Sequence, residues 1–74
     1  MTADEAIKVA LDVLYKEIEI PEEDDIICTQ IEETDEGFYI ECNSRIYTEK
    51  DDLMYALVLA PIVVRSDGSY SFVF

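Results

Sequence analysis

Carboxylates are the chemically distinctive side chains of this sequence, and most of them lie in one stretch. Between Lys16 and Arg45 there are eleven acidic residues and no basic residue. A surface with so much negative charge opposes compaction, and it can attract a positively charged partner rapidly and specifically. We predict that these residues belong to a binding surface for a protein with a basic face. The alternative is an acidic surface that serves only solubility. The acidic residues are Glu17, Glu19, Glu22, Glu23, Asp24, Asp25, Glu32, Glu33, Asp35, Glu36 and Glu41.

The same side chains offer little for catalysis or for binding a cofactor. The chain has no histidine, which is the commonest general base and metal ligand. The acidic segments 22–25 and 34–37 lack the alternating ligands and central glycine of a calcium-binding EF-hand loop. No glycine-rich phosphate loop is present. We therefore predict a protein that is not an enzyme and that needs no cofactor or metal.

The two cysteines, Cys28 and Cys42, are too few for a disulfide scaffold and do not form a C-x-x-C motif. If residues 26–32 and 38–44 form a hairpin, an even register places both thiols on one face of the sheet. In a reducing compartment we expect them to be buried, reduced and unreactive.

Length, composition and charge limit the class of protein. Seventy-four residues, half of them apolar, predict a single domain, residues 1–74, with its own hydrophobic core. A net charge of -13 argues against direct binding to nucleic acid or to an anionic membrane. The sequence shows no signal-peptide pattern and no apolar run of membrane-spanning length. We predict a cytoplasmic protein.

A helix is expected from about residue 3 to residue 18. Thr2 and Glu5 have the spacing of a capping box. Acidic residues follow the predicted helix C-terminus, where the helix dipole favours cations, and such a local conflict often marks a functional surface. The apolar residues with helical spacing are Ala3, Ile7, Ala10, Leu11, Leu14 and Ile18.

Strands are expected over most of the remaining chain. Residues 26–32 and 38–44 should form one hairpin, with Gly37 at a left-handed turn position. Residues 62–65 and 69–74 should form a second hairpin with a bulge at Gly68, which aligns Ile62 and Val64 with Tyr70 and Phe72. Polar residues 48–52 should form a loop that includes at most one helical turn. The predicted fold is α+β, with one N-terminal amphipathic helix packed on an antiparallel sheet of about four strands (α-β-β-β-β).

Side-chain alternation assigns each residue of the first hairpin to a face. Tyr39 falls on the face away from the helix and close to acidic residues, so we predict it as an apolar anchor of the binding surface. Tyr47 and Tyr55 are further candidates. The helix-facing residues should be Ile26, Cys28, Phe38, Ile40 and Cys42, and the residues of the other face Ile27, Thr29, Ile31, Tyr39, Glu41 and Asn43.

Residues 43–69, NSRIYTEKDDLMYALVLAPIVVRSDGS, resemble the C-terminal half of the YrhB-like immunity proteins (immunity protein 35). That family has Asn-Ser and a basic residue, then Tyr-x-Glu, Tyr-Ala-Leu, Pro-Ile-x-Val and Asp-Gly-Ser. The resemblance implies a small cytosolic protein that neutralises a toxin encoded beside it. The matching residues are Asn43, Ser44, Arg45, Tyr47, Glu49, Tyr55, Ala56, Leu57, Pro61, Ile62, Val64, Asp67, Gly68 and Ser69.

The sequence also departs from the family pattern in three places. The family's Gly-Trp is Gly37-Phe38 here, and the aromatic pair before its Asn-Ser is Glu41-Cys42. The family's Gly-Asn before the proline is missing, and the segment 58–60 is one residue shorter. The fold implied by the resemblance is unaffected by these changes, whereas the binding surface has room to differ.

Two other functions fit the same features. One is a phage-encoded inhibitor, such as an anti-CRISPR or anti-restriction protein, whose carboxylates replace DNA phosphates as a DNA mimic. The other is a weak homodimer formed through an exposed edge strand near Phe74, as opposed to a monomer. Genome context would distinguish the first alternative from a toxin inhibitor.

Overall fold

Helix α1 (Ala3–Glu17) begins at Thr2 through the predicted capping box. The Thr2 hydroxyl accepts a hydrogen bond from Glu5 N (3.2 Å), and the Glu5 carboxylate accepts one from Thr2 N (2.8 Å). The helix ends one residue earlier than predicted, because Ile18 has extended backbone.

The buried face of α1 is rotated from the predicted face. Ala6 and Val13, which the prediction omitted, are buried, whereas Ala3 is exposed. The bulky Ile7 and Leu11 are only partly buried and pack at the margin of the core. Small side chains at the centre of the contact let the helix lie close to the sheet, and the spacing of bulky residues does not reveal this.

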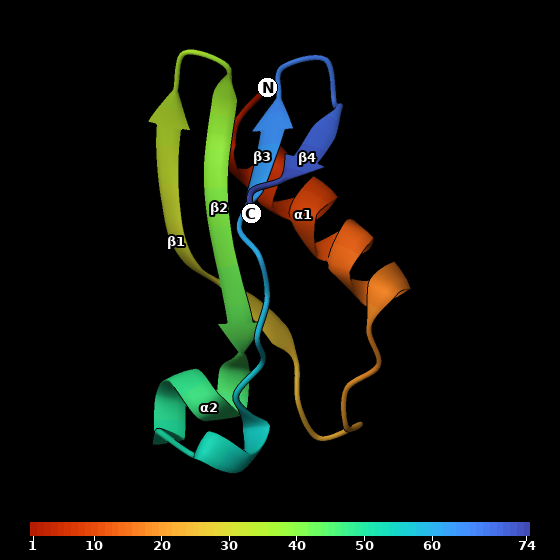
Figure 1. The fold of residues 1–74 in the computed structure, drawn as a ribbon, viewed down its shortest axis with the longest axis vertical. Helices are drawn as coiled ribbons and strands as arrows, with labels where there is room; N and C mark the ends of the chain where they lie inside the picture. Colours follow the sequence, from red (N-terminus) through yellow and green to blue (C-terminus); the bar gives the residue numbers. More distant parts are fainter.

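The computed structural model describes all 74 residues, and four antiparallel strands follow α1 in the order β1-β2-β3-β4 (Figure 1). Helix α1 packs against one face of this sheet and contacts β1, β2 and β3. The predicted α+β fold with an N-terminal helix and four strands is therefore confirmed. The strands are β1 (Ile26–Thr34), β2 (Gly37–Ser44), β3 (Ile62–Arg65) and β4 (Tyr70–Phe72).

The sheet face opposite α1 is named here the outer sheet face. In Figure 1 no element covers its central part, and only α2 (Arg45–Lys50) lies near its lower end. The strand register assigns to this face Ile27, Gln30, Glu32, Tyr39, Glu41, Asn43, Val63, Arg65 and Ser71.

A β-bulge at Thr29 changes which residues of β1 face the helix. Thr29 has no partner on β2, because its two neighbours pair with consecutive residues of that strand. An extra residue reverses the alternation of side chains beyond it. Ile31 therefore pairs with the buried Ile40 on the helix side. The prediction that Ile31 lies on the outer sheet face is wrong.

Gly37 does not occupy the left-handed turn position that the sequence predicted, and both its positive φ and a close contact with β3 favour glycine there. It lies within β2, has a φ of 152° and pairs with both Thr34 and Arg65. A Cβ atom at this position would lie 2.1 Å from the carbonyl oxygen of Val64. The β2–β3 contact thus excludes any side chain here.

The second hairpin has the predicted register. Ile62 pairs with Phe72 and Val64 pairs with Tyr70. Gly68, with a φ of 87°, supplies the left-handed residue of the turn and donates a hydrogen bond to Arg65 O (2.9 Å).

Helix α2 takes the place of residues 48–50 of the predicted loop 48–52, and a 3-10 turn follows that loop. Helix α2 starts immediately after β2, with Ser44 as its N-cap, and ends at Asp51, which has left-handed backbone. A 3-10 turn, η1 (Leu53–Tyr55), follows, capped by Asp52. An extended segment, 56–61, then returns to the sheet.

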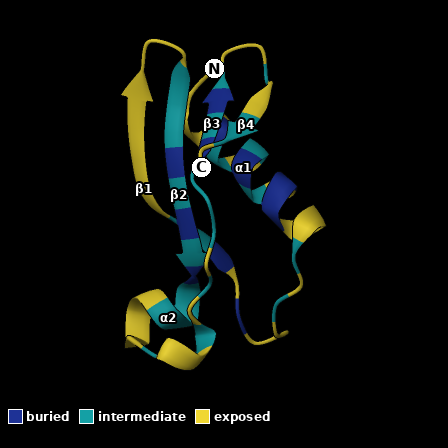
Figure 2. Ribbon diagram, in the orientation of Figure 1, coloured by how far each residue is buried: buried dark blue, intermediate teal, exposed yellow.

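The core lies between α1 and the sheet. Figure 2 shows buried residues on α1, β2 and β3, whereas most of β1 is exposed. No helix is both long enough and apolar enough to cross a membrane. The buried apolar residues are Ala6, Ala10, Val13, Leu14, Ile26, Ile40, Cys42, Ile62 and Val64.

Candidate protein-binding surface

Asp24 differs from the other acidic residues because it is buried, with only 5% of its surface exposed. Its carboxylate accepts hydrogen bonds from the Ser44 hydroxyl, from Asp25 N (2.8 Å) and from Ile46 N (3.0 Å). Asp24 therefore connects the segment after α1 to the start of α2. It is not available to a partner, contrary to the prediction from sequence.

The ionisation of Asp24 reflects this setting. Desolvation raises the pKa of the carboxyl, but hydrogen bonds from Ser44 and from the N–H groups of Ile46 and Asp25 outweigh it. Together with the nearby charge of Arg45, they hold the pKa of Asp24 below its ordinary value. Asp24 is thus an anion that the fold itself satisfies.

Arg45 forms an ion pair with a second acidic residue of the run, Asp25. Its Nε lies 3.2 Å from an Asp25 carboxylate oxygen, its Nη1 lies 3.2 Å from a Glu49 oxygen, and its Nη2 donates to Glu23 O (2.9 Å). Asp25 is half-exposed in this pair. It stays close to the surface, but part of its charge is already neutralised.

Asn43 completes the connection by holding the return segment. Its Oδ1 accepts hydrogen bonds from Leu57 N (2.9 Å) and Ser44 N (2.8 Å), and its Nδ2 donates to Leu57 O (3.0 Å). The Asn43-Ser44-Arg45 segment thus joins three parts of the chain. It is the start of the family-like segment, and its contacts here are structural.

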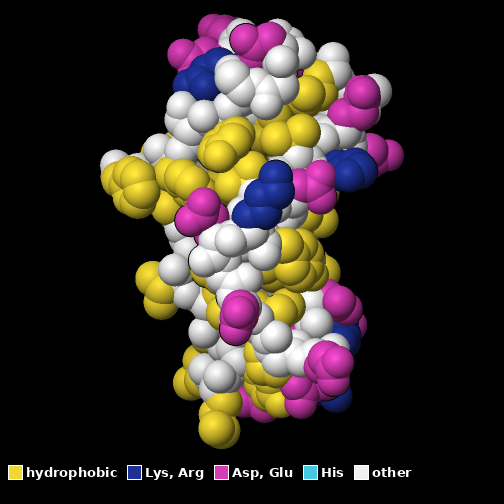
Figure 3. Space-filling view, turned by 90° about the vertical axis from the view of Figure 1, so that its right-hand side faces the viewer, with side chains coloured by type: hydrophobic (Ala, Val, Ile, Leu, Met, Phe, Trp, Pro, Cys, Tyr) yellow, Lys and Arg dark blue, Asp and Glu magenta, His cyan; other side chains and the backbone are white.

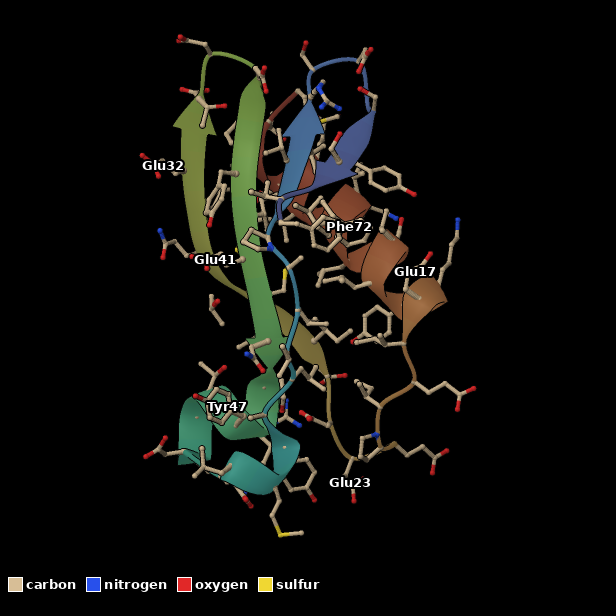
Figure 4. All side chains as sticks on the ribbon, in the orientation of Figure 1. Glu17, Glu23, Glu32, Glu41, Tyr47 and Phe72 are labelled. Atoms are coloured by element: carbon tan, nitrogen blue, oxygen red, sulfur yellow. The ribbon has the colours of Figure 1, made fainter.

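The remaining nine acidic residues of the run form no ion pair. The structure separates them into two groups. In Figure 4, Glu17 and Glu23 lie near the C-terminal end of α1 and the loop below it, whereas Glu32 and Glu41 lie on the first hairpin. We name Glu17, Glu19, Glu22 and Glu23 the helix-exit acids, and Glu32, Glu33, Asp35, Glu36 and Glu41 the hairpin acids.

The two groups do not merge into one acidic side. Figure 3, which views the molecule from the right-hand side of Figure 1, shows carboxylates interspersed with hydrophobic side chains on that side. The fold places the helix exit and the first hairpin in different regions (Figure 4). Each group therefore has to be considered as a surface of its own.

Tyr39 lies where the sequence places it, on the outer sheet face. It pairs with Glu32 of β1 on one side and with Val63 of β3 on the other. Glu41 follows two residues later on the same face of β2. Tyr39 is partly exposed, so an aromatic residue lies next to two unpaired carboxylates on a surface that no helix covers.

The thiols pair as predicted but are not equally buried. Cys28 lies directly opposite Cys42, and both are free. Cys42 is buried, whereas Cys28 is partly exposed, so the prediction of two buried thiols is correct for Cys42 only. Burial raises the pKa of Cys28, and burial with the neighbouring Cys28 raises the pKa of Cys42 to about 12. Neither thiol is suited to nucleophilic chemistry near neutral pH.

Other features limit the chemistry of the surface. No group of three or more acidic or cysteine side chains converges as metal ligands. Tyr47 lines a polar hollow of about 320 Å³ with Thr29, Asn43, Thr48 and Asp51 at the lower end of the outer sheet face. This hollow contains no buried polar atom without a hydrogen-bond partner.

Exposed apolar residues outside the acidic stretch were missed at the sequence level. Leu53 is 76% exposed and Met54 is 93% exposed, whereas Val58 is fully exposed. The available signal was a pair of large apolar residues directly after acidic Asp51 and Asp52. Such a pair next to charge is typical of a contact surface.

Comparison with known proteins identifies no relative of this chain. No family model, no curated protein and no solved structure matches the chain.

Proposed function

We propose that this protein binds a basic surface of another protein and inhibits it, as an immunity protein does with its toxin. The observation that supports this most directly is Tyr39 on the uncovered outer sheet face, next to the unpaired carboxylates of Glu32 and Glu41. The resemblance of residues 43–69 to immunity proteins supports the toxin as the class of partner. In this proposal the protein acts by occupying a surface and catalyses no reaction.

The two kinds of residue have different tasks in the complex. The hairpin acids orient a cationic partner during approach and increase the association rate. The Tyr39 ring supplies apolar area that water leaves on binding, and such central aromatic residues often dominate affinity. Charge alone would give a complex that weakens strongly with salt.

The DNA-mimic alternative is less well supported by the arrangement of the acids. A mimic of DNA needs carboxylates in a regular row that follows a phosphate backbone. The residues of β1 on the outer sheet face are Ile27, Gln30, Glu32 and Thr34, with a single carboxylate among them. On β2 the same face has Tyr39, Glu41 and Asn43. The geometry therefore suits a local cationic patch better than an extended nucleic-acid site.

A protection experiment tests the proposal. The protein is co-expressed with the product of the neighbouring gene in its genome, and cell growth is compared with and without it. We expect the wild type to restore growth and to bind the purified toxin. Absence of protection, or a neighbouring product that is not toxic, would contradict the immunity function.

Tyr39→Ala tests the proposed contact. We expect it to weaken toxin binding by at least ~2 kcal/mol, measured by calorimetry, with a nearly unchanged Tm. Tyr70→Ala is the matched control, because Tyr70 is a 45% exposed tyrosine that lies on the other face of the sheet. Normal binding by a folded Tyr39→Ala protein would place the contact elsewhere.

A further inference from the structure

A second contact region lies between the helix exit and η1, away from the outer sheet face. A groove of about 480 Å³ separates residues 19–24 from residues 52–57. The apolar side chains that line it are Ile20, Pro21, Met54, Ala56 and Leu57, together with Tyr55. Apolar grooves of this kind bind a complementary side chain or short segment.

The charged residues of the groove are all acidic. Glu19 and Asp52 line it at the surface, and the buried Asp24 lies at its inner side. No lysine or arginine contributes to its lining. The cations nearest to the groove residues in sequence are Lys16 and Lys50, and neither lines the groove. Arg45 is already bound to Asp25 and Glu49. A positively charged group placed here would meet no competing cation of the protein itself.

The surface next to the groove is also acidic. Glu22 and Glu23 line an adjoining open surface, and neither forms an ion pair through its side chain. In Figure 3, carboxylates and hydrophobic side chains lie next to one another at the lower end of the molecule. An apolar floor with an acidic rim is complementary to an apolar side chain flanked by cations.

Met54 contributes in a particular way. Its side chain is 93% exposed although it lines the groove. Methionine is flexible and polarisable, and it is common on surfaces that adapt to an inserted apolar group. The position of its backbone is set by Asp52, whose carboxylate accepts a hydrogen bond from Met54 N (3.1 Å).

We propose that this groove binds a basic segment of a partner protein, in which an apolar side chain is flanked by arginine or lysine. The inference rests on the proposed function, because it assigns a second contact of the same cationic partner. A second copy of this chain does not fit, because its net charge of -13 would place acids against acids. An anionic lipid surface is excluded for the same reason.

The test uses synthetic peptides as probes and 15N-labelled protein. The first probe is acetyl-Gly-Arg-Leu-Arg-Gly-amide. Three controls replace arginine with glutamine, arginine with glutamate, or leucine with glycine. We expect the first peptide to shift the backbone amide signals of Ile20, Tyr55 and Leu57 in a saturable manner. Binding of the glutamine and glycine controls should be at least about five-fold weaker, and the glutamate peptide should not bind.

Two variant pairs locate the contact. Met54→Ala should weaken binding of the first peptide at least about three-fold. Leu53→Ala should not, because Leu53 is an exposed apolar neighbour that does not line the groove. Glu19→Gln should weaken peptide binding. Asp4→Asn, the same charge change at the other end of α1, should not. Each variant is checked for an unchanged Tm, so that loss of folding is not mistaken for loss of contact.

Three results would overturn the inference. They are shifts centred on Tyr39, equal binding of all four peptides, and no saturation up to about 5 mM peptide, a concentration that corresponds to negligible affinity. None of them bears on toxin protection, which is measured separately by co-expressing the wild-type protein with the toxin. A result that contradicts peptide binding in the groove is therefore distinguishable from one that contradicts the proposed function.

Discussion

At the scale of single residues, neighbouring carboxylates have unrelated roles. Asp24 is buried and receives three hydrogen bonds, whereas the adjacent Glu23 is exposed and its side chain forms no ion pair. The difference does not follow from side-chain chemistry. It follows from the position of Ser44 and Ile46, which provide donors to one carboxylate and not to the other.

Asp24→Asn should destabilise the protein, because an amide cannot accept from all three donors as an anion does. We expect the Tm at pH 7 to fall by at least about 5 °C, measured by thermal unfolding followed by circular dichroism. Glu23→Gln is the control and should leave the Tm nearly unchanged. An unaltered Tm for Asp24→Asn would show that this connection contributes little to stability.

The same variant predicts a pH dependence. The pKa of Asp24 in the folded protein is below its ordinary value of 3.8. The contribution of this carboxylate to the stability of the fold is therefore fully present above about pH 4. It is lost as the pH falls through the lower folded pKa. The Tm difference between wild type and Asp24→Asn should therefore narrow below about pH 4. Asp67 and Glu5 also have lowered pKa values, but they titrate in both proteins and cancel in the difference.

The two thiols should react slowly and in order. Burial raises the pKa of both, and Cys42 is the more buried. We expect Ellman's reagent at pH 7.5 to modify native Cys28 slowly and Cys42 only after unfolding, with two thiols counted in denaturant. A Cys28→Ser variant identifies the slower site. Rapid reaction of Cys42 in the native state would contradict its place in the core.

At the scale of elements, the β2–β3 contact depends on one glycine. Gly37→Ala should destabilise the protein by more than about 2 kcal/mol, because its Cβ would meet Val64 O and its φ is unfavourable for alanine. Gly68→Ala is the matched control: its φ is positive, but nothing lies within 4 Å of the added atom. We expect it to cost about 1 kcal/mol from backbone strain alone.

Urea unfolding of both glycine variants separates the two causes of destabilisation. Equal losses at Gly37 and Gly68 would mean that backbone conformation accounts for both. A larger loss at Gly37 indicates that contact with β3 adds to it. The measurement also reports on the outer sheet face, since β3 places Val63 beside Tyr39 there.

At the scale of the whole molecule, the distribution of charge matters more than its total. Asp24 and Asp25 are used by the fold, and the nine other acids of the run are divided between the helix exit and the hairpin. Each group lies beside apolar side chains, Tyr39 in one case and the groove residues in the other. The molecule thus presents two acidic and apolar surfaces.

Neutralising part of the helix exit should not harm the fold. We expect Glu22→Gln with Glu23→Gln to raise the Tm by about 1–3 °C at low salt, because self-repulsion is reduced. The gain should disappear at high salt, where surface charges are screened. Adding Asp24→Asn to these two substitutions should lower the Tm below that of the wild type. A lower Tm for the double variant would indicate that these two acids support the structure.

Local patterns in the sequence were sufficient for several features. The capping box of Thr2 and Glu5 predicts where α1 begins, and alternation with Gly68 predicts the register of the second hairpin. Tyr39 was also placed on the correct face. These features depend on residues close to one another in the chain, so spacing and backbone preference alone are informative.

Tertiary structure alone decided the features that depend on distant segments. The bulge at Thr29 exists only in the pairing with β2, and the contact that excludes a side chain at Gly37 arises only because β3 approaches it. Asp24 is buried because Ser44, twenty residues later, provides its hydrogen bond. The separation of the acids into two surfaces arises in the same way. The order of acidic residues along the chain does not show which carboxylate will be buried by hydrogen bonds from a distant segment.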